Sequence, residues 1–187
     1  MPLHPHLPPP ARPRGCALAL AALLACAAAQ AQVAASAPAE RRNWFDDPFL
    51  QATNGLAGCP VPDAPLLTEA EMQHETHWRA ERGTSCFRSG RCRLPNAYLY
   101  DQEIAPRVVK TIAMAGGFAD TSVWVEGQRR WVWLKGCVST PEQAQEMERI
   151  VRLVDDVEAV IPQLIVGTKM PPGVPVYRLP PPAAPHP

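Results

Sequence analysis

The sequence lacks three features that would point to common classes of protein. After residue 31, no apolar stretch approaches the ~20 residues that a membrane-spanning helix needs. Basic and acidic side chains balance at 18 each, so the chain has no basic footprint for nucleic acid. It also lacks a nucleophile elbow, a phosphate-binding glycine loop and a His-Glu-x-x-His motif. We therefore expect no enzymatic activity, no cofactor and no small-molecule substrate.

Proline, in contrast, is abundant, and its 23 copies concentrate at the two ends of the chain. Such ends are typical of extended segments, and residues 169–187 are predicted to be a disordered, proline-rich tail. The length of 187 residues and the hydrophobic fraction of 47% suit one globular domain with appendages.

The first 31 residues are typical of a secretory signal peptide. An arginine-containing leader precedes an apolar run from Cys16 to Ala29, and Ala29-Gln30-Ala31 is a small-residue cleavage site. We expect cleavage after Ala31 and a soluble protein in the periplasm of a Gram-negative bacterium. An alternative is open, because Leu23-Leu24-Ala25-Cys26 resembles a bacterial lipobox. Lipidation of Cys26 would anchor the same protein to a membrane.

Four cysteines follow the signal, and their even number in an exported chain indicates two disulfides. Cys86 and Cys92 flank a short segment with a flexible Ser-Gly pair, so they can meet across a tight loop. Of the three possible pairings we favour Cys86–Cys92 with Cys59–Cys137. A zinc site formed by His74, His77, Cys86 and Cys92 is the alternative. It would require reduced cysteines, and their spacing is not typical of zinc ligands.

The N-terminal half is predicted to contain a linker and a helical extension. Residues 32–66 combine prolines, alanines and glycines, which is typical of a linker. Trp44, Phe45 and Phe49 form an aromatic cluster within it that could dock on the folded domain or on a partner. Residues 67–96 form the cysteine-containing extension.

The helix in this extension has a clear start signal. Thr68 and Glu71 predict a capping box, and Leu67 and Met72 predict a hydrophobic staple. We expect the helix to end at Gly83.

Residues 97–168 have the most regular pattern of apolar side chains. A helix is predicted from about Ile104 to Gly116, with Pro106 in its first turn. Two runs of two-residue periodicity predict a hairpin that turns at residues 126–129. Thr140 caps a second helix, and residues 157–166 read as a third strand, with an exposed edge at Pro162.

The predicted fold class is therefore α+β, with the order αββαβ. Its three-stranded sheet carries both helices on one face, and the helical extension precedes it.

The residues of this region carry a family resemblance. The matching positions are Ile104, Val108, Phe118 to Val123, Trp133 to Thr140, Ile150-Val151, Val157 to Val160 and Leu164 to Val166. Over residues 100–168 the pattern resembles the BON domain (bacterial OsmY and nodulation), and Gly136, within the second strand, is its most telling position. The resemblance implies a non-enzymatic, export-associated module that contacts phospholipid or envelope surfaces. One copy and a cysteine-bearing extension depart from many family members.

One face of the predicted hairpin gathers tryptophan and cations. Trp124, Trp131 and Trp133 share the face opposite the helices, with Lys135 and Arg130 nearby. Such a surface suits a boundary between apolar lipid tails and anionic headgroups. The alternative is that a Cys59–Cys137 disulfide draws the extension across this face and closes it as a second small core.

The expected function is therefore binding of envelope components, with a phospholipid surface as the partner. An adaptor that binds another envelope protein through the Trp44–Phe49 segment or the tail is the alternative.

Overall fold

The computed structural model describes residues 39–170. The predicted signal peptide, the alternative lipidation site Cys26 and nearly all of the predicted tail lie outside the described residues. The structure contains β1 (Phe49–Asn54), α2 (Glu69–Arg88), a 3₁₀ helix η2 (Ala97–Tyr100), α3 (Asp101–Ala115), β2 (Ser122–Gln128), β3 (Trp131–Val138), α4 (Pro141–Val151) and β4 (Ala159–Val166).

The sheet has four strands in the order β1-β2-β3-β4, so the prediction of three strands is wrong. The additional strand, β1, comes from the segment that the sequence suggested as a linker, and it pairs antiparallel with β2. The hairpin of β2 and β3 is antiparallel, as expected. β4 pairs parallel with β3 and forms an edge of the sheet, in agreement with Pro162 in its middle.

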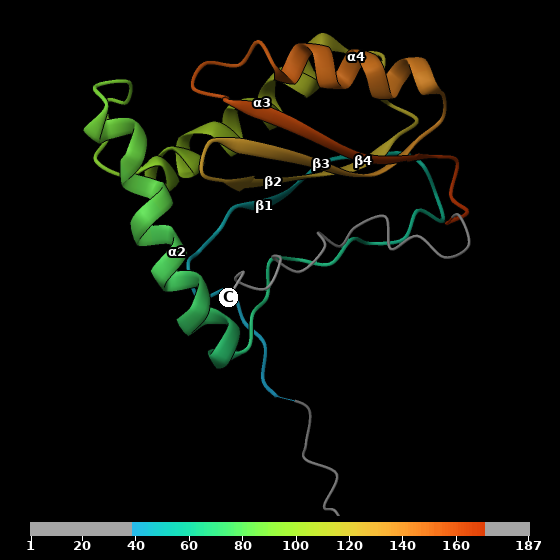
Figure 1. Cartoon of the computed structure of the whole chain (residues 1–187). Coiled ribbons are helices and arrows are strands. Elements are labelled where there is room, and N and C mark those ends of the chain that lie inside the picture. The colour runs from blue at the N-terminus through green and yellow to red at the C-terminus, as the bar shows by residue number, and fades with distance from the viewer. Residues whose placement is uncertain (1–38, 171–187) are drawn as a thin grey trace, which may run out of the picture. The chain divides into compact units, whose positions relative to one another are not determined.

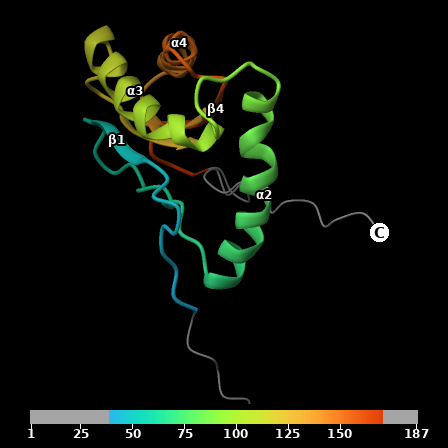
Figure 2. The ribbon, with the colours of Figure 1, turned by 90° about the vertical axis from the view of Figure 1, so that its left-hand side faces the viewer.

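Helices α3 and α4 pack on the same face of the sheet, which we call the helix face (Figure 1). Figure 2, turned by 90°, again places both helices together, with α2 apart from them. The residues buried between the helices and the sheet are almost all apolar; those with no exposed surface include Ile104, Val108, Val123, Val125, Val132, Leu134 and Met147. The prediction that both helices pack on one face of the sheet is therefore confirmed.

Two predicted helix boundaries are wrong. The helix α2 begins as expected, with the Thr68–Glu71 capping box in place, but it continues past Gly83 to Arg88. Gly83 is buried, and a Cβ atom there would lie 2.3 Å from Oδ1 of Asn96. This glycine therefore permits close packing rather than ending the helix. The helix α3 begins at Asp101, three residues before Ile104, and Pro106 lies beyond its first turn.

The hairpin turn is also displaced from its predicted position. Glu126, Gly127 and Gln128 belong to β2, and the chain reverses at Arg129 and Arg130, which have φ values of 57° and 67°. Residues other than glycine rarely adopt a positive φ. The carboxylate of Asp101 stabilises this turn, since it accepts hydrogen bonds from the backbone N–H groups of Arg129 at 2.6 Å and Arg130 at 2.7 Å.

Candidate functional site

The face of the sheet opposite the helices bears the three tryptophans of β2 and β3, and we call it the tryptophan face. Trp124 is 8% exposed and Trp133 only 3%, while Trp131 is partly buried. Lys135 is buried as well, and its Nζ donates to Glu126 at 2.5 Å. Burial raises the pKa of Glu126, although Lys135 opposes the shift. These side chains are therefore not arranged as an open surface.

Residues 55–63, which follow β1, cover part of the tryptophan face and are called the covering segment here. Ser122 Oγ donates to the Leu56 carbonyl and accepts from the Leu56 N–H, each at 3.0 Å. Cys59 forms a disulfide with Cys137, whose side chain is fully buried on β3. Lys135 Nζ lies 3.5 Å from the Asp63 carbonyl. The structure thus has the Cys59–Cys137 disulfide on which the closed alternative depended, and the covering segment lies over part of this face.

A second attachment joins the extension to the domain through buried charge. Arg79 on α2 forms a bidentate pair with Asp47, and both side chains are less than 10% exposed. The guanidinium group also lies between the rings of Phe45 at 3.9 Å and Tyr98 at 4.3 Å. Burial acts to lower the pKa of Arg79, but the hydrogen bonds and charge of Asp47 raise it. This cluster fixes α2 beside the domain.

The aromatic cluster of Trp44, Phe45 and Phe49 makes its contacts within this chain. Trp44 Nε1 donates to the Leu67 carbonyl at 2.7 Å, and Phe45 packs on Arg79. Phe49 is part of β1. Docking within the chain was one of the two expected uses of this cluster, and the structure displays it.

The zinc alternative loses its thiolate ligands, because Cys86 and Cys92 are joined in a disulfide. His74 Nε2 accepts a hydrogen bond from Trp78 Nε1 at 2.9 Å, and His77 lies 3.3 Å from Glu81. Within residues 39–170, no group of three or more His, Cys, Asp or Glu side chains is placed to hold a metal ion. Both disulfides match the pairing that the sequence favoured.

Arg130 and Gly136 occupy different environments from the tryptophans. The Arg130 side chain donates to the Asp156 carbonyl at 2.8 Å and lies over the Tyr100 ring. Gly136 has a φ of 129°, and a Cβ atom there would lie 2.2 Å from the Ser122 carbonyl oxygen of the neighbouring strand. Only glycine fits at this position.

The exposed surface of the helix layer contains a groove between α3 and α4. The groove has a volume of about 620 Å³, and its lining includes Lys110 and Met114 on α3 and Leu153 after α4. Met114 and Leu153 are 76% and 71% exposed, which is unusual for two neighbouring large apolar side chains. Lys110 is exposed and has no ion-pair partner among residues 39–170. Sequence reasoning missed this groove, although Met114 stands outside the buried stripe of Ile104, Val108 and Ile112.

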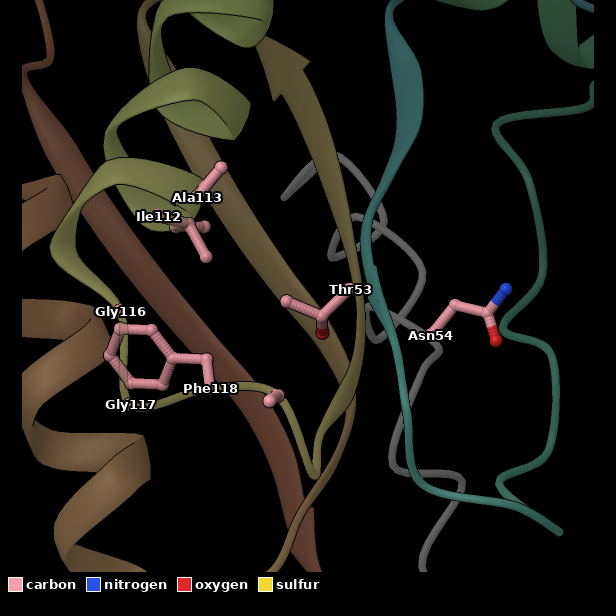
Figure 3. Close-up of a pocket in the computed structure, with 8 residues that line it drawn as sticks. Thr53, Asn54, Ile112, Ala113, Gly116, Gly117 and Phe118 are labelled. Atoms are coloured by element: carbon pink, nitrogen blue, oxygen red, sulfur yellow. The ribbon is translucent and has the colours of Figure 1, made fainter.

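A smaller cavity of about 280 Å³ lies between the end of α3 and the end of β1 (Figure 3). Ile112 and Phe118 line one side, and Thr53 faces them, whereas the Asn54 side chain points away from the cavity. Thr53 Oγ1 is already hydrogen-bonded to Thr121 Oγ1 at 2.7 Å and to the Val123 N–H at 2.9 Å. The cavity therefore offers few free polar groups for a ligand.

A family model for the BON domain matches residues 100–168. This match begins at the end of η2, just before α3, and ends after β4. Residues 100–168 are a BON domain. No curated protein and no solved structure matches the chain. The BON domain thus supplies α3, α4 and three of the four strands, while β1, the covering segment and α2 lie before it.

BON domains are associated with phospholipid and envelope binding and are generally non-enzymatic. Within residues 39–170, no helix is both long enough and apolar enough to cross a bilayer.

Proposed function

We propose that this is a non-enzymatic protein of the bacterial periplasm that binds anionic phospholipid surfaces through the groove between α3 and α4. The observation that carries the proposal is the exposed Lys110, which has no ion-pair partner within residues 39–170, beside the exposed side chains of Met114 and Leu153. Apolar side chains gain free energy when they enter the boundary between headgroups and acyl chains. A neighbouring ammonium group is attracted to anionic headgroups. The groove combines both requirements.

Other groups around the groove support an electrostatic contribution from Lys110 in particular. Arg107 also lines the groove, but its guanidinium group donates to the Asp155 carbonyl at 3.0 Å and to the Asp156 carboxylate at 3.1 Å. The charge of Arg107 is therefore partly neutralised by this chain. Lys110 is the cation best placed to contact a phosphate.

The proposal moves the binding surface away from the tryptophan face suggested by the sequence. Trp124, Trp133 and Lys135 are buried, so the residues that cover them would have to move before these side chains could reach a membrane. The groove needs no such rearrangement, because its apolar side chains are already exposed.

Vesicle sedimentation tests the proposal with the purified, oxidised protein. We expect sedimentation with vesicles that contain phosphatidylglycerol, and much less with vesicles of phosphatidylcholine alone. The variant Met114→Glu/Leu153→Glu should lose about tenfold or more in apparent affinity, because two buried apolar contacts are worth more than 1.4 kcal/mol. Lys110→Gln should weaken binding to anionic vesicles only.

Leu99→Glu is the matched control, because Leu99 is also apolar and 52% exposed but lies on η2, outside the groove. It should bind as the wild type does. Equal sedimentation of the groove variant and the wild type would exclude the groove, and no sedimentation of the wild type would exclude lipid binding. In that case, cross-linking in intact envelopes would test the adaptor alternative, for which a single stoichiometric protein partner is expected.

A further inference from the structure

A short loop, closed by a disulfide, lies at the end of α2, and we call it the disulfide loop. It begins at Cys86 in the last turn of the helix and ends at Cys92, to which Cys86 is bonded. The side chains of Phe87, Arg88 and Arg91 between them are exposed, and Phe87 is 47% exposed although it is large and apolar. A single exposed apolar side chain is common on protein surfaces. This one is accompanied by two cations, and that combination is what a binding surface for an apolar, anionic partner requires.

The disulfide loop is held in one conformation before any partner binds. The Gly90 N–H donates to the Phe87 carbonyl and the Arg91 N–H donates to the Cys86 carbonyl, each at 2.9 Å. Cys92 packs against the apolar core of the domain, which fixes the end of the loop. The entropy lost on ordering a loop is a cost of binding, and here it is already met by the fold.

The two cations of the disulfide loop keep their charge available. Neither Arg88 nor Arg91 forms an ion pair with a side chain in the part of the chain that the structure describes. Arg91 Nε donates to the hydroxyl group of Ser89 at 3.0 Å, which is a neutral acceptor. The carboxylate of Glu103, at the start of α3, is bound by Arg93 at 2.9 Å. Both guanidinium groups of the loop can therefore contact an external anion.

The disulfide loop lies on the same side of the sheet as α3 and α4 (Figure 1). Figure 2 again places the end of α2 level with these two helices, above the sheet. The groove with the exposed side chains of Met114 and Leu153 belongs to this helix layer. A flat, extended partner on this side of the molecule can therefore meet the groove and the loop together.

We propose that the disulfide loop is a second contact with anionic phospholipid surfaces, separate from the groove. The Phe87 ring enters the boundary between headgroups and acyl chains, where aromatic rings are favoured. Arg88 and Arg91 contact the phosphate groups. This inference rests on the proposed function for its partner, but its residues precede the BON domain. Two weak contacts on one rigid body bind a surface more tightly than either does alone.

Vesicle sedimentation of the full, oxidised protein tests the loop separately from the groove. Arg88→Gln/Arg91→Gln should weaken binding to phosphatidylglycerol vesicles about 25-fold, because each cation near such a surface contributes about fivefold. The affinity of this variant should also depend less on salt concentration than that of the wild type. Phe87→Ser should weaken binding about fivefold and leave the salt dependence unchanged.

Arg41→Gln/Arg42→Gln is the matched control for charge. Both arginines are exposed and lie near the opposite end of α2, where Arg41 pairs with Glu71 and the backbone of Arg42 pairs with that of Leu67. The control changes the net charge by the same amount as the loop variant. It should bind vesicles nearly as the wild type does, and circular dichroism checks that each variant is folded.

The outcomes separate this inference from the proposed function. Weaker binding by the loop variants, with Met114→Glu/Leu153→Glu unchanged, would support the loop and exclude the groove. Wild-type binding by the loop variants, with the groove variant impaired, would overturn the inference and leave the proposed function standing. Equal losses in the loop arginine variant and its charge control would show an effect of net charge alone and would also overturn it. No sedimentation of the wild type with phosphatidylglycerol would overturn both.

Discussion

The two faces of the sheet are closed in different ways. The helix face is closed by α3 and α4, whose apolar stripes are regular and lie within the BON domain. The tryptophan face is closed partly by the covering segment, and it holds a buried ion pair and a disulfide. It also holds two buried indole N–H groups that have no hydrogen-bond partner in the described part of the chain. Burial of apolar area alone accounts for the first face. The tryptophan face depends on a disulfide and on buried ion pairs, and each of these can be removed by substitution.

The largest expected effect is loss of the long-range disulfide. Cys59 and Cys137 are 78 residues apart, so their bond restricts the unfolded chain strongly. Cys59→Ser/Cys137→Ser should reduce the free energy of unfolding by about 4 kcal/mol. Cys86→Ser/Cys92→Ser, which opens a loop with a separation of only 6, should cost about 2 kcal/mol. Denaturant titration measures both, and equal losses would mean that the covering segment is not held in place by its disulfide.

The sequence predicted the helix face far better than the tryptophan face. Capping boxes at Thr68 and Thr140, the hairpin and the helical stripes all follow from local patterns, and the structure displays each of them. Strand β1 has no such pattern, because FLQATN lacks a clear alternation of apolar and polar residues. It becomes a strand only through pairing with β2, which lies about 70 residues further along the chain.

The hairpin turn and the attachment of α2 were less predictable, because they too depend on contacts between residues far apart in the sequence. The hairpin turn at Arg129 and Arg130 depends on Asp101, which is 28 and 29 residues away. The Asp47–Arg79 pair joins residues 32 apart. The cysteine pairing could be inferred, because short loops and parity restrict it. Which surface stays exposed could not, because that depends on how the extension folds back.

The second-largest effect concerns the ionic attachment of α2. Asp47→Asn removes the buried, bidentate partner charge of Arg79 and leaves it only Glu75, whose Oε1 lies 3.4 Å from Nε. We expect a loss of about 3 kcal/mol in the free energy of unfolding. The comparison variant Glu103→Gln removes an exposed partner of Arg93 and Arg107 and should have little effect. Denaturant titration of both variants checks the difference. Similar small losses would mean that this pair does not fix α2.

The last prediction concerns the effect of pH on the hairpin turn. Burial raises the pKa of Asp101 to about 7, although the backbone N–H groups of Arg130 and Arg129 oppose the shift. Since the ordinary value is 3.8, the folded state retains a proton between about pH 4 and pH 7 that the unfolded state has lost. The stabilisation from this proton is present below about pH 4 and is lost as the pH rises to about 7.

Comparison with Asp101→Asn isolates this contribution, because the amide does not titrate. The stability of the wild type relative to this variant should fall as the pH rises from 4 to 7 and then remain constant. A difference that stays constant across this range, or that grows with pH, would show that the Asp101 carboxylate is charged throughout.

The central claim is that β1 is an integral part of the sheet and that the covering segment, which follows it, closes part of the second face. Amide hydrogen exchange of β1 tests this most directly, because the backbone hydrogen bonds between β1 and β2 exist only if residues 49–54 are folded onto the domain. We predict that amides of Phe49–Asn54 that bond to β2 exchange as slowly as those within the hairpin of β2 and β3. Exchange of these amides at the rate of an unstructured chain, with the hairpin still protected, would contradict the account.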